Sequence, residues 1–163
     1  MRVSSLLASV AGASAASAAV MRVAADSMGW NWAVTEWTAG CAGASNCHYD
    51  FNVTGIGNST DYPATPSFKA YCSGQGEGAP YKACTATGES ETAYVVAAKL
   101  LPKTNVTNGT LPQPHIQVSI QFTDLNSAST WWNYTGRAEA KYNQFVAPPM
   151  NFTIVPDEIF GVA

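Results

Sequence analysis

The stretch Ile116-Gln-Val-Ser-Ile-Gln-Phe-Thr123 decides the fold class of this 163-residue chain. Its apolar side chains alternate with polar ones at every position: Ile116, Val118, Ile120 and Phe122. Successive side chains of a β-strand point to opposite faces, so the alternation predicts a strand with one buried face and one face in water.

Similar segments recur along the chain, each bounded by residues that favour turns. The expected strands cover 32–37, 47–54, 68–72, 81–85, 93–101, 116–123, 133–142 and 151–154. Gly, Pro, Asn and Ser clusters separate them, and no helical period competes. Eight or so short strands without intervening helices are typical of an all-β protein, an antiparallel β-sandwich or a small β-barrel. Within the first strand, we expect Trp32 and Val34 on one face and Trp37 on the other.

The composition limits the possible partners. Only 12% of the residues are charged, about half of what is usual for a soluble domain, and the formal net charge is −3. A chain without a basic patch is a poor partner for nucleic acid, because phosphate neutralisation needs clustered Lys and Arg. No later stretch reaches the roughly 18 consecutive apolar residues of a membrane span. We therefore expect neither nucleic acid nor a membrane as partner after the leader is removed.

Residues 1–19 have the pattern of a secretory signal peptide. Arg2 precedes a short apolar segment, which is followed by an Ala/Ser/Gly-rich exit containing Ala16-Ser17-Ala18. A basic start, an apolar middle and small residues at the cleavage positions are what signal peptidase requires. We expect cleavage after Ala18 or Ala19, a loose tail over 20–29, and one β-barrel domain over 30–163.

The cysteines support secretion. Cys41, Cys47, Cys72 and Cys84 are even in number, and their gaps do not match the C-x2-4-C pairs of zinc sites. Three pairings are possible, and we favour Cys41–Cys47 with Cys72–Cys84 because each closes a short local loop. Each bridge would stabilise the fold by about 2–3 kcal/mol. No odd cysteine remains, so we expect no disulfide-linked dimer.

The glycosylation motifs are a second signal of secretion. Asn-x-Ser/Thr sequons begin at Asn52, Asn58, Asn105, Asn108, Asn133 and Asn151. Chance would supply about two in a chain with this number of asparagines. Asn52, Asn133 and Asn151 fall on the polar phase of their expected strands, where a glycan would not disturb the core. The sequence therefore predicts a glycoprotein whose sugars lie on outward strand faces.

Little in the sequence is typical of catalysis. Its two histidines, His48 and His115, have no orienting partner nearby in sequence, and no nucleophile, metal or phosphate-loop motif is present. We therefore expect no enzymatic activity, no metal and no cofactor. A glycoside hydrolase remains an alternative, because it needs only two carboxylates whose pairing spacing does not reveal. The candidates are Asp50, Asp61, Asp124 and Glu139.

Trp131 and Trp132 suggest a carbohydrate-binding alternative. Adjacent residues of a strand point to opposite faces, so one of the two indoles is expected to be exposed. An exposed, rigidly held indole can stack on a sugar ring, although core packing explains many tryptophans equally well.

Four segments together share a pattern with one known family. They are Trp32-Ala-Val-Thr-Glu-Trp37, Cys47-His-Tyr-Asp-Phe-Asn-Val53, the 68–84 hairpin, and Tyr94-Val-Val-Ala-Ala-Lys-Leu-Leu-Pro102. In them the chain resembles the fungal secreted β-barrel proteins related to the major Alternaria allergen. The resemblance implies a disulfide-stapled barrel without established enzymatic activity, whose relatives act on plants as effectors or elicitors and on people as allergens. It also implies that Cys72 and Cys84 staple a hairpin and Cys41 and Cys47 the neighbouring loop.

The sequence thus predicts a secreted, non-enzymatic fungal glycoprotein that acts outside the cell at a host or cell-wall interface. Its partner would be a host protein or a cell-wall polysaccharide. The alternatives are a carbohydrate-binding module that uses Trp131 or Trp132, and a glycoside hydrolase.

Overall fold

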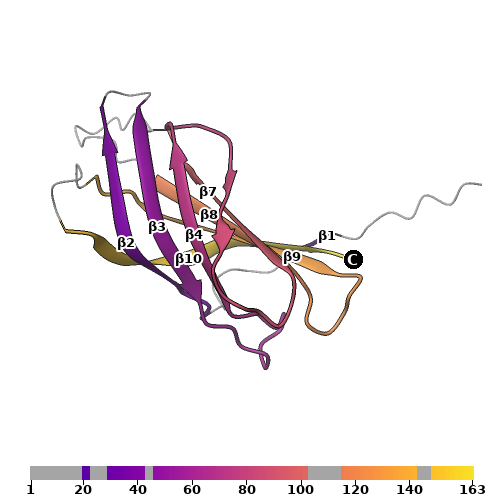
Figure 1. The fold of residues 1–163 in the computed structure, drawn as a ribbon. Coiled ribbons are helices and arrows are strands. Elements are labelled where there is room, and N and C mark those ends of the chain that lie inside the picture. Colours follow the sequence, from indigo (N-terminus) through magenta and orange to yellow (C-terminus); the bar gives the residue numbers. More distant parts are fainter. Residues whose placement is uncertain (1–19, 23–28, 43–45, 103–114, 143–147) are drawn as a thin grey trace, which may run out of the picture.

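The protein is an all-β, nearly closed antiparallel barrel, as predicted (Figure 1). The computed structural model describes residues 20–22, 29–42, 46–102, 115–142 and 148–163. The predicted signal peptide over 1–19 and the sequons at Asn105 and Asn108 lie outside these residues. The described part of the chain contains no apolar helix of membrane-spanning length.

Ten strands are described. They are β1 (Val20–Arg22), β2 (Trp32–Cys41), β3 (Cys47–Gly55), β4 (Phe68–Gln75), β5 (Lys82–Ala83), β6 (Thr85–Ala86), β7 (Tyr94–Leu100), β8 (His115–Thr123), β9 (Trp131–Glu139) and β10 (Met150–Val162). Nine of them follow the order β5-β7-β8-β9-β10-β2-β3-β4-β6, and β1 pairs with β10. Figure 1 shows β2, β3 and β4 side by side, with β10 in yellow running across toward the C-terminus.

β10 joins the two halves of the barrel. Its first residues, up to Ile154, pair with β2, whereas Val155 to Val162 pair with β9. The change of partner lies next to a register shift that follows Pro156. Proline has no N–H for a ladder, so it is tolerated at such a bulge. The sequence predicted a strand only over 151–154, because the alternation breaks at this bulge while the strand continues.

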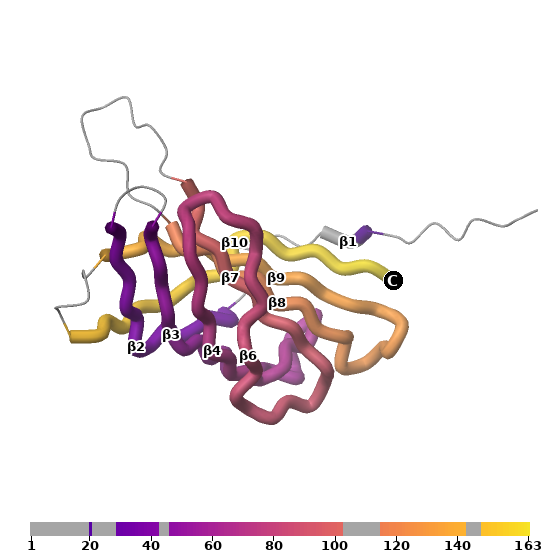
Figure 2. The backbone as a smooth tube through the Cα atoms, turned by 45° about the horizontal axis from the view of Figure 1, so that its top comes forward, coloured from indigo at the N-terminus to yellow at the C-terminus, as the bar shows by residue number. Residues whose placement is uncertain are grey.

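The N-terminal strand β1 pairs with the second half of β10, with Val20 opposite Val162 and Arg22 opposite Phe160. Figure 2 shows it beside the C-terminal segment. The sequence indicated only a loose tail at these positions. A three-residue strand is too short for alternation to reveal it.

The other side of the barrel lies between β4 and β7, where the segment 82–86 pairs first with β7 and then with β4. We call this boundary between β4 and β7 the seam. β5 pairs with β7, and β6 pairs with β4. Figure 2 shows β6 beside β4. Between β5 and β6, Cys84 donates its N–H to the carbonyl of Val96 on β7 (2.8 Å) and is joined by a disulfide to Cys72 on β4. The single strand expected over 81–85 is therefore divided at the residue that crosses the seam.

Aromatic rings fill the barrel interior. The ring of Trp30 contacts those of Trp32, Phe68, Phe122 and Tyr134 at centroid distances between 5.0 and 5.8 Å. All five side chains are buried. Edge-to-face contacts of this kind add to the stabilisation from apolar burial. The core is thus packed with side chains, and candidate binding surfaces lie on the outside.

The prediction that Trp37 faces away from Trp32 is wrong, because both side chains are fully buried. The register between β2 and β3 shifts between Thr35 and Thr38, and Glu36 adopts a φ of 56°. This β-bulge adds one residue to β2, which reverses the alternation beyond it. Trp37 is therefore turned inward as well.

Candidate functional site

The seam is bridged by a tyrosine. Tyr49 points inward from β3, and its hydroxyl donates a hydrogen bond to the carbonyl of Ala98 on β7 (3.0 Å). The Tyr49 side chain passes beside Gly74 of β4. A Cβ added to Gly74 would lie 2.3 Å from the tyrosine oxygen. Glycine at position 74 therefore makes room for this contact. Burial raises the pKa of Tyr49 to about 12, so the hydroxyl keeps its proton at physiological pH.

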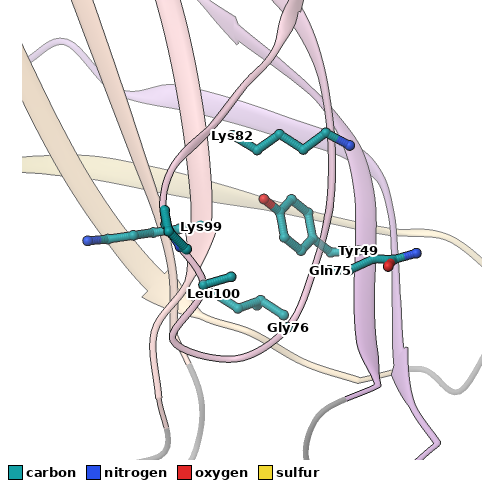
Figure 3. Close-up of a pocket in the computed structure, with 8 residues that line it drawn as sticks. Tyr49, Gln75, Gly76, Lys82, Lys99 and Leu100 are labelled. Atoms are coloured by element: carbon teal, nitrogen blue, oxygen red, sulfur yellow. The ribbon is translucent and has the colours of Figure 1, made fainter.

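A pocket of about 300 Å³ opens at this point, and we call it the seam pocket. It is lined by Tyr49, Gln75, Gly76, Ala79, Pro80, Lys82, Lys99 and Leu100. Figure 3 shows the Lys82 side chain running over the Tyr49 ring, whereas the Lys99 ammonium points away from that ring. The Lys99 ammonium lies instead 4.3 Å from the centre of the Tyr81 ring, and Tyr81 does not line the pocket. Lys82 is therefore the lysine whose side chain extends across the pocket (Figure 3).

The loop after β4 forms the rim of the seam pocket. Gly76 and Gly78 have φ values of 85° and 74°, which favour glycine. The N–H of Gly76 donates to the carbonyl of Cys47 (2.7 Å), and that of Gly78 donates to the carbonyl of Leu100 (2.8 Å). The loop is thus tied to β3 and to β7, and the rim is fixed by backbone hydrogen bonds.

The acidic side chains near the pocket have partners of their own. Asp50 accepts a hydrogen bond from the Thr38 hydroxyl (2.8 Å), and Glu77 accepts one from the Tyr142 hydroxyl (2.7 Å). Burial, followed by the hydrogen bond and charge of Glu77, raises the pKa of Tyr142. Among the described residues, neither carboxylate forms a salt bridge with a pocket lysine.

A second, shallower depression of about 200 Å³ adjoins the seam pocket. It shares Tyr49, Gln75 and Lys82 with the pocket and extends along the outer faces of β3 and β4. Its further lining residues are His48, Asp50, Tyr71, Ser73 and Gly74. We call the seam pocket and this depression together the seam groove.

Sequence reasoning missed the seam groove, because its residues come from three separate segments of the chain. One usable signal was Gly74, a glycine on the buried phase of β4. Isolated glycines within strands often mark a close approach of another group. That signal does not say that Tyr49 is the group, nor that Lys82 would lie above it.

The two tryptophans have different environments. Trp132 is buried and donates from Nε1 to the Asp124 carboxylate (2.6 Å). Trp131 is half-buried, and its ring contacts Phe160 edge-on at 5.7 Å. It lines a shallow depression of about 270 Å³ together with Val95, which is 61% exposed. Trp131 is therefore the member of the pair that reaches the surface.

The four described sequon asparagines lie outside the core, and the prediction that Asn52, Asn133 and Asn151 occupy outward strand faces is confirmed. Asn58 is exposed in the loop after β3. The Asn133 side-chain amide donates to the Ser119 hydroxyl (3.0 Å). Occupancy by glycans stays a prediction.

The cysteines pair as predicted, Cys41 with Cys47 and Cys72 with Cys84. The Glu77 carboxylate and the sulfur atoms of Cys41 and Cys47 lie within 4.8 Å of one another. A metal prefers thiolate sulfur, and these two sulfur atoms are joined in a disulfide. This cluster therefore does not fit a metal ion in the oxidised protein.

The fold distributes the other candidate groups over several elements. Asp61 lies in the loop after β3 and accepts from the Asn58 side-chain amide (2.9 Å). After burial, which is the main cause, the charges of Asp61 and Asp124 raise the pKa of Tyr134. Glu139 and His115 lie opposite each other at the ends of β9 and β8. The fold thus brings Asp61 and Asp124 toward one common neighbour, Tyr134.

No family model matches the chain, and neither does any curated protein or solved structure. The nearly closed barrel and its two disulfides therefore stand without a family assignment.

Proposed function

We propose that the protein is a secreted, non-enzymatic fungal glycoprotein that recognises a partner outside the cell, at a host or cell-wall interface. In this proposal it belongs among the effector-, elicitor- and allergen-like barrels that it resembles in sequence. Two disulfides support an oxidising compartment, because such bridges are rare in the reducing cytosol.

The observation that carries the proposal is the division of the outer surface. The described sequons lie on β3, β9, β10 and the loop after β3, at Asn52, Asn133, Asn151 and Asn58. The continuous segment 68–100, which builds β4 to β7, contains no sequon. The seam pocket lies on this segment and on Tyr49. The adjoining depression also includes His48 and Asp50 of β3, the strand that carries Asn52. Because the interior is filled by aromatic rings, a sequon-free outer face is the natural place for recognition.

The test is to express the full chain in a fungal host and to apply the purified product to plant leaf tissue and to isolated cell walls. We expect a secreted protein without free thiols, whose mass falls on enzymatic deglycosylation, and which binds the walls or triggers a defence response. Retention inside the cell, free thiols, or a product inert toward both materials would contradict the proposal.

A carbohydrate-binding module is the second candidate, supported by the half-buried Trp131 beside the exposed Val95. A glycan array should then show selective sugar binding that Trp131→Ala abolishes. Tyr62→Ala is the matched control, because Tyr62 is an aromatic residue that is 84% exposed and lies elsewhere on the surface. Equal loss in both variants, or no loss, would count against a Trp131 platform.

A further inference from the structure

We propose that the shallow depression beside Trp131, which we call the Trp131 depression, is the docking site of the chain's own N-linked glycan at Asn133. In this arrangement the first N-acetylglucosamine of the glycan lies against the Trp131 indole. The inference rests on the part of the proposed function that makes the chain a secreted glycoprotein. It assigns to Trp131 a sugar of the same chain, in place of the free sugar of the second candidate function.

The order of residues on β9 places the sugar acceptor next to the ring. Trp131, Asn133 and Thr135 follow one another at intervals of two, so their side chains lie on the same face of the strand. Trp132 and Tyr134, between them, are buried in the core. Two residues of a strand span about 7 Å. A sugar ring bonded to the Asn133 side chain therefore begins within reach of the indole.

This sequon differs from the others in the residue that precedes it on the strand face. Of the six sequons, only the one at Asn133 has an aromatic residue two positions before the asparagine. The residues at that position before Asn52, Asn58 and Asn151 are Asp50, Ile56 and Pro149. A ring on its own strand face is thus available to Asn133 and not to the other described sequon asparagines.

The hydrogen bonds of Asn133 set the direction of its amide group. The side-chain carbonyl oxygen accepts from the hydroxyl of Thr135 (3.2 Å), which lies on the side away from Trp131. The amide nitrogen is at the other corner of the group and donates to the Ser119 hydroxyl on β8 (3.0 Å). With its oxygen turned toward Thr135, the amide directs a glycan on the nitrogen over β8 and toward Trp131.

The Trp131 depression begins beside this amide. Gln121, which lines the depression, is the β8 residue directly opposite Asn133, and Thr123 is the one opposite Trp131. The Gln121 side chain is exposed, and its amide can donate to and accept from the hydroxyl and acetamido groups of a sugar. The hollow is therefore placed to receive the first sugar as it leaves Asn133.

The indole is supported on one side and open on the other. Phe160 of β10 contacts the Trp131 ring edge-on at a centroid distance of 5.7 Å, and β10 lies on the opposite side of β9 from β8. On the β8 side the ring borders the depression, where Val95 of β7 is 61% exposed. A sugar ring laid there would remove apolar surface of Trp131 and Val95 from water, which stabilises the folded state.

Attachment of the glycan is compatible with this geometry. The donor is a lipid-linked oligosaccharide diphosphate of the secretory pathway. The bond between the sugar C1 and the diphosphate oxygen breaks, a bond from C1 to Nδ2 of Asn133 forms, the lipid diphosphate leaves, and one amide hydrogen is released as a proton. The side-chain carbonyl of Asn133 is unchanged, so it still accepts from Thr135.

The experiment is a double-mutant cycle on the full chain, secreted by a fungal host and trimmed by an endoglycosidase to one N-acetylglucosamine per occupied sequon. It compares the unmodified protein, Asn133→Gln, Trp131→Ala and the double variant by urea unfolding. Glycopeptide mass spectrometry establishes that Asn133 carries the sugar. We expect Asn133→Gln to raise the equilibrium constant for unfolding about fivefold more in the presence of Trp131 than in Trp131→Ala.

Two controls isolate the sugar from the side chains. The same cycle on unglycosylated protein from a bacterial periplasm should show no coupling between Asn133 and Trp131. Asn58→Gln is the matched variant, because Asn58 is a sequon asparagine exposed in the loop after β3. Its effect on unfolding should be the same with and without Trp131.

A second measurement does not depend on the stability of Trp131→Ala. In NMR spectra of the trimmed, unmodified protein, the ring current of the indole should shift proton resonances of the Asn133 sugar upfield relative to those of the Asn58 sugar. Nuclear Overhauser effects should join the same sugar protons to the Trp131 ring.

The inference is overturned by an empty Asn133 beside other occupied sequons, by a cycle without coupling, or by equal coupling in the unglycosylated protein or at Asn58. Unshifted resonances of the Asn133 sugar would also overturn it. Each of these results leaves the proposed function standing if the protein still binds walls or triggers a response. Coupling between the Asn133 sugar and Trp131 in a protein inert toward walls and tissue would refute the proposed function alone.

Discussion

Glu36 has an unusual backbone conformation for a non-glycine residue, and its neighbours explain how it is held. Its φ is 56°, in the left-handed region that favours glycine. Its N–H donates to the side-chain carbonyl of Asn151 on β10 (3.1 Å), and its carboxylate accepts from the side-chain amide of Asn52 on β3. Two sequon asparagines therefore support the bulge that turns Trp37 into the core.

This arrangement predicts different effects for two ways of removing the Asn151 sequon. Asn151→Ala deletes both the glycan acceptor and the hydrogen-bond acceptor of Glu36, and we expect it to lower the free energy of unfolding by about 1 kcal/mol. Thr153→Val deletes the sequon but keeps Asn151 and a residue that favours strands. It should leave the stability of enzymatically deglycosylated protein unchanged. Urea unfolding and glycopeptide mass spectrometry measure the two effects. Equal destabilisation by both variants would show that the hydrogen bond to Glu36 contributes nothing.

At the scale of strands, the alternation of apolar and polar residues was sufficient to predict the buried face wherever the hydrogen-bond ladder between neighbouring strands is regular. The strands β3 and β8 have the predicted buried faces, and β8 departs only at Gln117, which is 7% exposed on its polar phase. Alternation failed where a bulge adds a residue, as at Glu36, and where Pro156 interrupts β10. A bulge is set by hydrogen bonds to other strands, such as the one from Glu36 to Asn151, and local sequence does not contain that information.

The closure of the barrel was likewise beyond prediction, although both disulfides were predicted. The spacing of Cys72 and Cys84 indicates a short loop, but not that Cys84 lies at a crossing between two sheets. The seam groove depends on that crossing, because Lys82 is placed over Tyr49 by the pairing of β5 with β7. Its residues are distant in sequence and share no motif.

The two disulfides should therefore have different local effects on the seam. Removing either pair by double substitution to alanine should lower the free energy of unfolding by about 2–3 kcal/mol. Only Cys72→Ala with Cys84→Ala should also speed hydrogen exchange in β5 and β6, because that bridge ties the crossing segment to β4.

The pair Cys41→Ala with Cys47→Ala is the matched control. This bridge joins β2 and β3, which are already paired along their length, so exchange at the seam should stay slow. Hydrogen exchange followed by mass spectrometry measures both variants. Unchanged protection of β5 and β6 without the Cys72–Cys84 bridge would contradict its assigned role in closure.

At the scale of the whole molecule, buried tyrosines make the barrel sensitive to high pH. Burial raises the pKa of Tyr49 to about 12 and also raises those of Tyr134 and Tyr142, whereas an unfolded tyrosine ionises near pH 10. Between these values the unfolded chain has lost protons that the folded protein retains. Folding stability is therefore fully present below pH 10 and falls as the pH rises toward 12.

Tyr49 provides a direct test, because its hydroxyl spans the seam. Tyr49→Phe should lower stability at neutral pH by about 1 kcal/mol, through loss of the hydrogen bond to Ala98. Above pH 10 it should lose stability less steeply than the unmodified protein, since one ionising group is gone. Tyr62→Phe is the control, because Tyr62 is exposed and should leave the slope unchanged. Urea unfolding at intervals from pH 8 to about 12 gives the slopes, and identical slopes for all three proteins would mean that the Tyr49 hydroxyl is not buried in the folded barrel.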